Sequence, residues 1–156
     1  MKSEAIKFFR KAYYHQMKGN YHKAVEYYEK SIEVEPTSEA HTFLGWTYSF
    51  MDRLDQAIEE CKKAILVDDS LGNPYNDIGS YLMRLDRHNE AIPWFEKAKL
   101  AERYENREFA YHNLGRVYEM IGLWPLAIKE YSDALKINCF YHPSKTALLK
   151  LKANYN

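Results

Sequence analysis

The feature that most constrains this chain is a set of small residues that recur at a step of about 34 positions. Glycines occur at 45, 79 and 115, and a second series keeps nearly the same step: Ala24, Ala57, Ala91 and Ala127. A glycine inside a helix costs roughly 1 kcal/mol relative to alanine. Its regular return therefore indicates that another element packs where a side chain would stand, once in every repeat.

The residues around these positions form two motifs. Residues 111–118 read YHNLGRVY, an aromatic-x-x-Leu-Gly-x-x-Tyr pattern, and looser copies begin at His41 and Tyr75. The alanine series is followed four residues later by Tyr28, Cys61, Phe95 and Tyr131. These patterns match W-x2-L-G-x2-Y and A-x3-F of the tetratricopeptide signature. The chain resembles tetratricopeptide-repeat proteins over nearly its whole length.

The resemblance implies an all-α fold, a right-handed α-solenoid in which each repeat is a hairpin of two helices, A and B. We expect one domain over 1–156 with no strand. Its parts are four repeats at about 5–37, 38–71, 72–105 and 108–141, and a capping helix at about 144–153. In this family the recurring glycines lie where helix B crosses helix A. Two extra residues between the third and fourth repeats are expected to lengthen a helix and tilt the fourth repeat.

The A–B turns read KGNYHKA, MDRLDQA, LDRHNEA and IGLWPLA. Gly19 and Gly122 suit a left-handed helix cap, and Asp52 and Asp86 stand at the same place in the other two turns. Pro93 is expected in the first turn of a B helix, where an amide has no intrahelical partner to lose.

Composition narrows the function classes. The chain has 22 basic and 22 acidic residues, so its charge gives no reason to expect nucleic acid as a partner. The first 20 residues carry several charges instead of the apolar run of a signal peptide, and no segment has the apolar length of a spanning helix. We therefore expect a cytoplasmic protein without membrane insertion. Two widely separated cysteines fit a reducing compartment.

No catalytic or metal-binding constellation is found. The six histidines are scattered without metal-ligand spacing, and His15 and His41 occupy core-facing repeat positions. The pair Glu59 and Glu60 is interpreted as a solvated helix face, and Cys61 as a small apolar filler. We expect no enzyme activity, no cofactor and no metal.

A second apolar stripe is the informative feature for binding. Phe43, Trp46 and Phe50 recur at helical spacing on a face of helix A that the hairpin does not need. In the family this face lines a concave groove that binds extended peptides or helices. The candidate groove residues are Phe9, Tyr13, Phe43, Trp46, Phe50, Asn76, Asp77, Arg84, His112, Asn113 and Arg116.

Two alternatives remain open for these residues. The aromatic rings of the stripe can pack only against neighbouring A helices. Arg84 and Arg116 can fork onto a partner's carboxylate, or can form ion pairs within the chain, with Asp77 or Glu119.

The resemblance predicts a non-enzymatic adaptor or scaffold that holds a peptide or helix of another protein. The carboxylate clamp of chaperone-binding relatives has Lys, Asn, Asn, Lys and Arg where this chain has Phe9, Tyr13, Phe43, Asn73 and Asp77, so that subclass is not expected. Alternatives are a small cytoplasmic chaperone for a secreted or assembling client, and a self-assembling scaffold in which a second copy of the chain is the partner.

Overall fold

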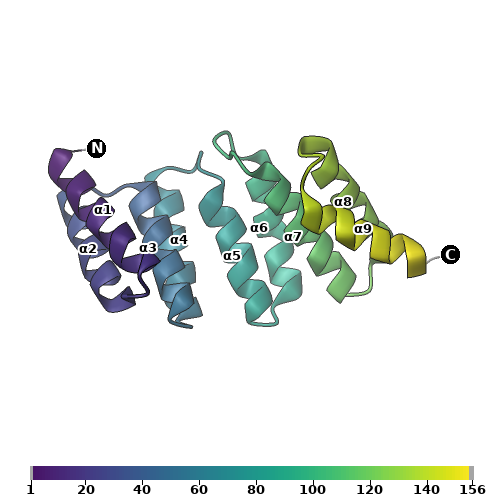
Figure 1. Ribbon diagram of the computed structural model, residues 1–156, viewed down its shortest axis with the longest axis horizontal. Helices are drawn as coiled ribbons and strands as arrows, with labels where there is room; N and C mark the ends of the chain where they lie inside the picture. The colour runs from purple at the N-terminus through teal and green to yellow at the C-terminus, as the bar shows by residue number, and fades with distance from the viewer. Residues whose placement is uncertain (1, 155–156) are drawn as a thin grey trace.

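The computed structural model describes residues 2–154 and contains nine α-helices within that range. In chain order they are α1 (Ser3–Met17), α2 (Tyr21–Val34), α3 (Ser38–Phe50), α4 (Leu54–Val67), α5 (Asn73–Arg84), α6 (His88–Leu100), α7 (Arg107–Met120), α8 (Trp124–Ile137) and α9 (His142–Asn154). The helices follow one another along a single axis, and the two termini lie at opposite ends (Figure 1). The predicted all-α solenoid is confirmed, since the described residues form no strand.

Each hairpin is closed by the small residues that the repeat predicts. A methyl group added at Gly79 of α5 would lie 2.6 Å from the Phe95 ring of α6, and one added at Gly115 would lie 2.6 Å from the Tyr131 ring. Real carbon atoms do not approach that closely, so a side chain at either glycine would push the two helices apart. The recurring glycines are packing positions, as predicted.

The four A–B turns share one backbone conformation. Gly19 and Gly122 have φ values of 76° and 80°, and Asp52 and Asp86 adopt φ values of 58° and 57°. Glycine enters this left-handed region without steric penalty, and aspartate is among the few other residues that tolerate it. Each turn therefore reverses the chain in the same way, which keeps the hairpins in one register.

The segment between α6 and α7 differs from the prediction. Its extra residues do not lengthen a helix, because they form a loop that folds back on the linker between α4 and α5. The Arg103 N–H donates to the Ser70 carbonyl oxygen at 2.9 Å, and the Gly72 N–H donates to the Arg103 carbonyl oxygen at 2.9 Å. The Tyr104 ring lies against Gly72, where an added methyl group would stand 2.4 Å from it. The insertion thus joins the linker between the second and third repeats to the linker between the third and fourth repeats.

Two expectations about single residues are wrong. Pro93 is the sixth residue of α6, beyond the first turn, so this helix lacks one internal hydrogen bond. Glu60 is buried, and its carboxylate accepts from His41 Nδ1 at 2.8 Å and from Lys63 Nζ at 2.6 Å. Burial alone would raise the pKa of Glu60, but these two bonds hold it below its ordinary value. A residue interpreted as solvated therefore ties α3 to α4.

Helix α9 closes the C-terminal end of the stack. Leu151 is 5% exposed and packs with Ala127 and Tyr131 of α8. Lysines 145, 150 and 152 of α9 are exposed. One apolar side docked on α8 and one charged side toward water are what a terminal helix of a solenoid requires, and the predicted capping helix is confirmed.

Candidate functional site

The A helices α1, α3, α5 and α7, with α9, form what we call the A-helix face, which is aromatic toward the N-terminus. There a continuous set of rings, the aromatic ladder, runs from α1 across α3 to the first residue of α2. It consists of Phe9, Tyr13, Phe43, Trp46, Phe50 and Tyr21. Successive ring centroids are 5.2 Å apart for Phe9–Phe43, 5.9 Å for Tyr13–Phe43, 5.6 Å for Phe43–Trp46, 5.5 Å for Trp46–Phe50 and 5.4 Å for Tyr21–Phe50.

Solvent exposure divides this ladder in two. Phe9 and Phe43 are half-buried and pack against the hydrophobic core. Tyr13, Trp46 and Phe50 are 42%, 39% and 47% exposed. The interpretation as inter-repeat packing therefore fits the base of the ladder, whereas the outer rings present apolar surface to solvent.

Polar side chains replace the rings farther along the A-helix face. Asn76 of α5 is buried, and its side-chain oxygen accepts from Asn113 Nδ2 of α7 at 3.1 Å. This amide pair links the A helices of the third and fourth repeats. Asp77 is half-buried, and no hydrogen bond or ion pair to its carboxylate is found within residues 2–154.

The two arginines of the predicted groove differ from each other. Both terminal nitrogens of Arg84 donate to the Ser49 carbonyl oxygen at 3.2 Å, and one contacts Asp52 Oδ1 at 3.2 Å. Arg84 thus ties α5 to the end of α3 through a partner that sequence reasoning did not name. Arg116 of α7 is exposed and makes no hydrogen bond or ion pair with the described residues.

A cleft of about 540 Å³ lies between α7 and α9. His112 enters it from α7, where its Nδ1 lies 2.9 Å from Ser144 Oγ and its ring is 5.3 Å from that of Tyr141. Burial, with a smaller contribution from the Arg116 charge, lowers the pKa of His112 to about 4. The ring is therefore neutral at pH 7 and anchors the capping helix.

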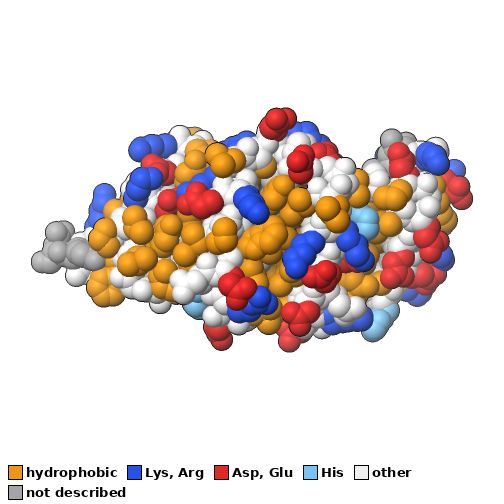
Figure 2. Space-filling model, turned by 180° about the vertical axis from the view of Figure 1, so that it is seen from behind, with side chains coloured by type: hydrophobic (Ala, Val, Ile, Leu, Met, Phe, Trp, Pro, Cys, Tyr) orange, Lys and Arg blue, Asp and Glu red, His pale blue; other side chains and the backbone are white. Residues whose placement is uncertain are grey.

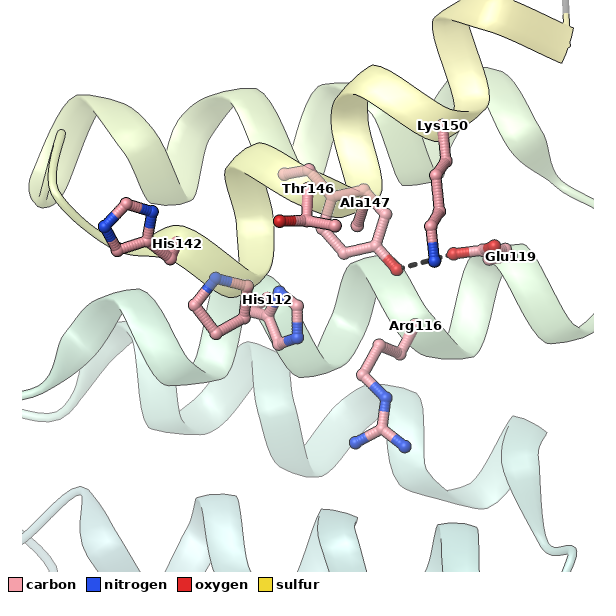
Figure 3. Close-up of a pocket in the computed structure, with 9 residues that line it drawn as sticks. His112, Arg116, Glu119, His142, Thr146, Ala147 and Lys150 are labelled. Atoms are coloured by element: carbon pink, nitrogen blue, oxygen red, sulfur yellow. Dashed lines mark hydrogen bonds between the residues drawn. The ribbon is translucent and has the colours of Figure 1, made fainter.

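Figure 3 shows how the charged side chains around this cleft are directed. Lys150 extends from α9 toward Glu119 of α7, while the Arg116 guanidinium points away from α9. Glu119 accepts a hydrogen bond from the Tyr131 hydroxyl at 2.7 Å. The cleft thus holds structural contacts between the fourth repeat and its capping helix, and Arg116 lines the cleft without a hydrogen bond or ion pair to the described residues.

Sequence reasoning missed one member of the ladder. Tyr21 begins α2, and its ring stacks on Phe50 of the next repeat with an interplanar angle of 13°. The available signal was its place in the A–B turn, where KGNYHKA carries an aromatic residue beside polar ones. That signal is weak because the contact joins two repeats, and the residue spacing within one repeat does not predict contacts with another.

Three other features would bear on function: a metal site, a nucleic-acid-binding surface and a membrane-spanning helix. Within the described part of the chain, no group of three or more His, Cys, Asp or Glu side chains is placed to hold a metal ion. On the face seen in Figure 2, basic and acidic side chains are interspersed among apolar ones, unlike the continuous basic surface typical of nucleic-acid binding. Among residues 2–154, no helix combines the length and apolar character needed to cross a bilayer.

Comparison with known proteins points to one family. Family models described as tetratricopeptide repeat match residues 5–38, 38–70 and 70–139. The chain is 30% identical over 79 residues to small glutamine-rich tetratricopeptide repeat-containing protein 2 of Mycosarcoma maydis, covering 50% of this chain and 22% of that protein. It is 28% identical over 123 residues to type IV pilus assembly protein PilF of Pseudomonas aeruginosa, covering 78% of this chain and 48% of that protein. The chain thus spans less than half the length of either relative.

Solved structures show the same fold at low sequence identity. Pseudomonas aeruginosa PilF superposes with a TM-score of 0.89 at 21% identity, over 97% of this chain and 69% of that one. MamA gives 0.78 at 24% identity, over 92% and 84% of the two chains. The first tetratricopeptide domain of Spaghetti (RPAP3), bound to the HSP90 peptide SRMEEVD, gives 0.70 at 20% identity, over 78% and 96%. At these identities the likeness shows the fold alone.

Proposed function

Because the chain belongs to the tetratricopeptide-repeat family, we propose that it is a non-enzymatic adaptor that binds a peptide or helix of another protein on its A-helix face. The observation that carries this proposal is the outer edge of the aromatic ladder. Tyr13 on α1 is linked through the Phe43 ring to Trp46 and Phe50 on α3, and each of these three outer rings is more than a third exposed.

The energetics favour a binding role for these rings. Fully burying an aromatic side chain stabilises a complex or a fold by about 1.5–3 kcal/mol, and Trp and Tyr dominate the residues whose loss weakens protein interfaces most. The ladder is also stiff, because each outer ring contacts another ring. The apolar surface is therefore preformed, and binding a partner costs this chain little conformational entropy.

A related fold supports the kind of ligand. The Spaghetti domain, which covers 78% of this chain on superposition, was solved with a bound peptide. The present chain lacks the basic residues of a carboxylate clamp on its first two A helices, where the ladder stands instead. We therefore expect its ligand to present apolar or aromatic side chains to α1 and α3.

The test is quantitative capture of partners from the native cell. Wild type is compared with Trp46→Ala combined with Phe50→Ala, and with a matched control, Phe140→Ala, which removes an aromatic ring that is 84% exposed in the loop before α9. The proposal predicts a partner whose recovery falls at least tenfold with the double variant and is unchanged with the control. Equal recovery with a folded double variant would move the binding site elsewhere.

A further inference from the structure

The further inference concerns Asp77, and it rests on the proposed function because it names a chemical feature of the same ligand. Asp77 is the residue of α5 that corresponds to Phe43 of α3, one repeat step of 34 residues earlier. At this step the aromatic ladder ends and a carboxylate takes the place of a ring.

Contacts observed in the other repeats indicate what surrounds this carboxylate. Phe43 lies beside Tyr13 and Phe9 of the preceding repeat, with ring centroids 5.9 Å and 5.2 Å away. The repeat equivalents of those two neighbours are Trp46 and Thr42. The same relation holds one repeat later, where Asn113, the equivalent of Asp77, bonds Asn76, the equivalent of Thr42.

In the part of the chain that the structure describes, no cation pairs with Asp77. The Thr42 hydroxyl donates to the Ser38 carbonyl oxygen at 2.7 Å, and Arg84 of the same helix is held by Ser49 and Asp52. Burial and, to a smaller extent, the Asp77 charge raise the pKa values of Cys61 of α4, Tyr81 of α5 and Tyr104 of the α6–α7 loop, and none of these three groups is a cation. Burial raises the pKa of Asp77 to about 7.

An isolated carboxylate in such a place is unfavourable unless it is paired. The repeat relation sets the Trp46 indole beside this carboxylate, and the face of an indole attracts cations through its quadrupole. A single cation between the Asp77 carboxylate and the Trp46 indole would interact favourably with both. A metal ion does not fit, because no cluster of ligating side chains accompanies Asp77 in the described residues, whereas an ammonium or guanidinium group brings its own hydrogen-bond donors.

We propose that Asp77 and Trp46 form a receptor for one cationic side chain, Lys or Arg, of the segment that binds the A-helix face. The carboxylate accepts its charge-assisted hydrogen bond, and the indole covers its apolar stem. The preferred ligand thus carries apolar or aromatic residues for the ladder and a basic residue one repeat step farther along the face.

The test uses a random linear peptide library displayed on phage, selected on the full chain. Parallel selections use Trp46→Ala, Asp77→Asn, which removes the charge at constant shape, and the control Asp69→Asn, an exposed carboxylate of the α4–α5 linker. Wild type and Asp69→Asn should select peptides that share a Lys or Arg at a fixed distance from apolar residues. Asp77→Asn should select peptides without that basic residue.

Synthetic peptides from the selection then complete a double-mutant cycle. Asp77→Asn should weaken a selected peptide roughly tenfold or more, as expected for a hydrogen bond between charged groups. Changing the peptide's basic residue to Gln should weaken binding to wild type equally and leave binding to Asp77→Asn unchanged. Affinity for wild type should rise as the pH increases from 5.5 to 8, whereas that of Asp77→Asn should stay level.

Three results would overturn the inference. Selected peptides that depend on Trp46 but share no basic residue would leave the proposed function standing and remove the cation receptor. A loss with Asp77→Asn but none on changing the peptide's Lys or Arg would assign the carboxylate to a ligand backbone N–H. If wild type selects no peptide that depends on Trp46, the proposed function fails, and this inference fails with it.

Discussion

The two halves of the A-helix face hold different residues at equivalent repeat positions. Phe43 in α3, Asp77 in α5 and Asn113 in α7 succeed one another at steps of 34 and 36 residues. The first packs among aromatic rings, the second has no hydrogen-bond or ion-pair partner among residues 2–154, and the third bonds Asn76 of the preceding repeat. The same repeat position thus holds a packed ring, a carboxylate unpaired within that range and a hydrogen-bonded amide. The repeat therefore fixes where a side chain lies, whereas the residue type decides what the side chain does.

The largest difference between the halves is expected in stability. Phe43→Ala removes a ring that contacts Phe9, Tyr13 and Trp46, and should lower the free energy of unfolding by about 3 kcal/mol. Asn113→Ala removes one neutral hydrogen bond and should cost about 1 kcal/mol. Urea unfolding followed by circular dichroism measures both. Equal losses would mean that the aromatic half is no more tightly packed than the polar half.

The middle member, Asp77, should respond to pH in the opposite sense to a paired carboxylate. Its pKa is raised by burial from 3.8 to about 7, so the stability of the wild type falls as pH rises between these values, when the unfolded chain ionises more readily. Asp77→Asn should match wild type near pH 4. At pH 8 it should be more stable by about 2 kcal/mol, after allowing for solvent screening.

The control for Asp77 is Asp69→Asn. Unfolding free energies of the three proteins at pH 4, 6 and 8 isolate the contribution of one carboxylate, because all other groups titrate alike. If the stability of Asp77→Asn relative to wild type did not increase with pH, Asp77 would be paired or solvated in the folded chain. Asp77 would then not differ from Phe43 and Asn113 in the way described above.

In the polar half, the docking of the capping helix α9 should become less stable in acid. The pKa of His112 is lowered from 6.5 to about 4, so its neutral form contributes stability that is complete above pH 6.5 and is lost as pH falls toward 4. We expect wild type to lose about 1–2 kcal/mol more than His112→Gln over this range. His142→Gln, at an exposed position, should behave as wild type. A common acid response in all three would remove His112 from the docking of α9.

Much of the hairpin architecture could be predicted, because the contact that closes each hairpin involves glycine and alanine at fixed spacing within one repeat. Gly79 and Gly115 mark the crossing points directly. The side chains that join different repeats could not be predicted in the same way. The Arg84–Ser49 and Asn113–Asn76 bonds depend on which residues meet across a junction between repeats.

The candidate site shows the same limit. Helical spacing identifies Phe43, Trp46 and Phe50 as one stripe, yet it cannot separate the ring that packs inward from the two that face solvent. That separation depends on Phe9 and Tyr13, which approach α3 from the preceding repeat. The partner of Arg84 was missed for a similar reason, since Asp52 lies in a neighbouring A–B turn.

A small loss of stability is expected where the outer rings of the ladder are removed, if these rings are kept for a ligand and do not hold the stack together. Trp46→Ala combined with Phe50→Ala removes two rings that are 39% and 47% exposed. Urea unfolding should show a loss of about 1 kcal/mol with unchanged helical content, beside about 3 kcal/mol for Phe43→Ala. If the double variant loses as much stability as Phe43→Ala, or loses helix, the outer rings are ordinary packing between repeats, which contradicts a role in ligand binding.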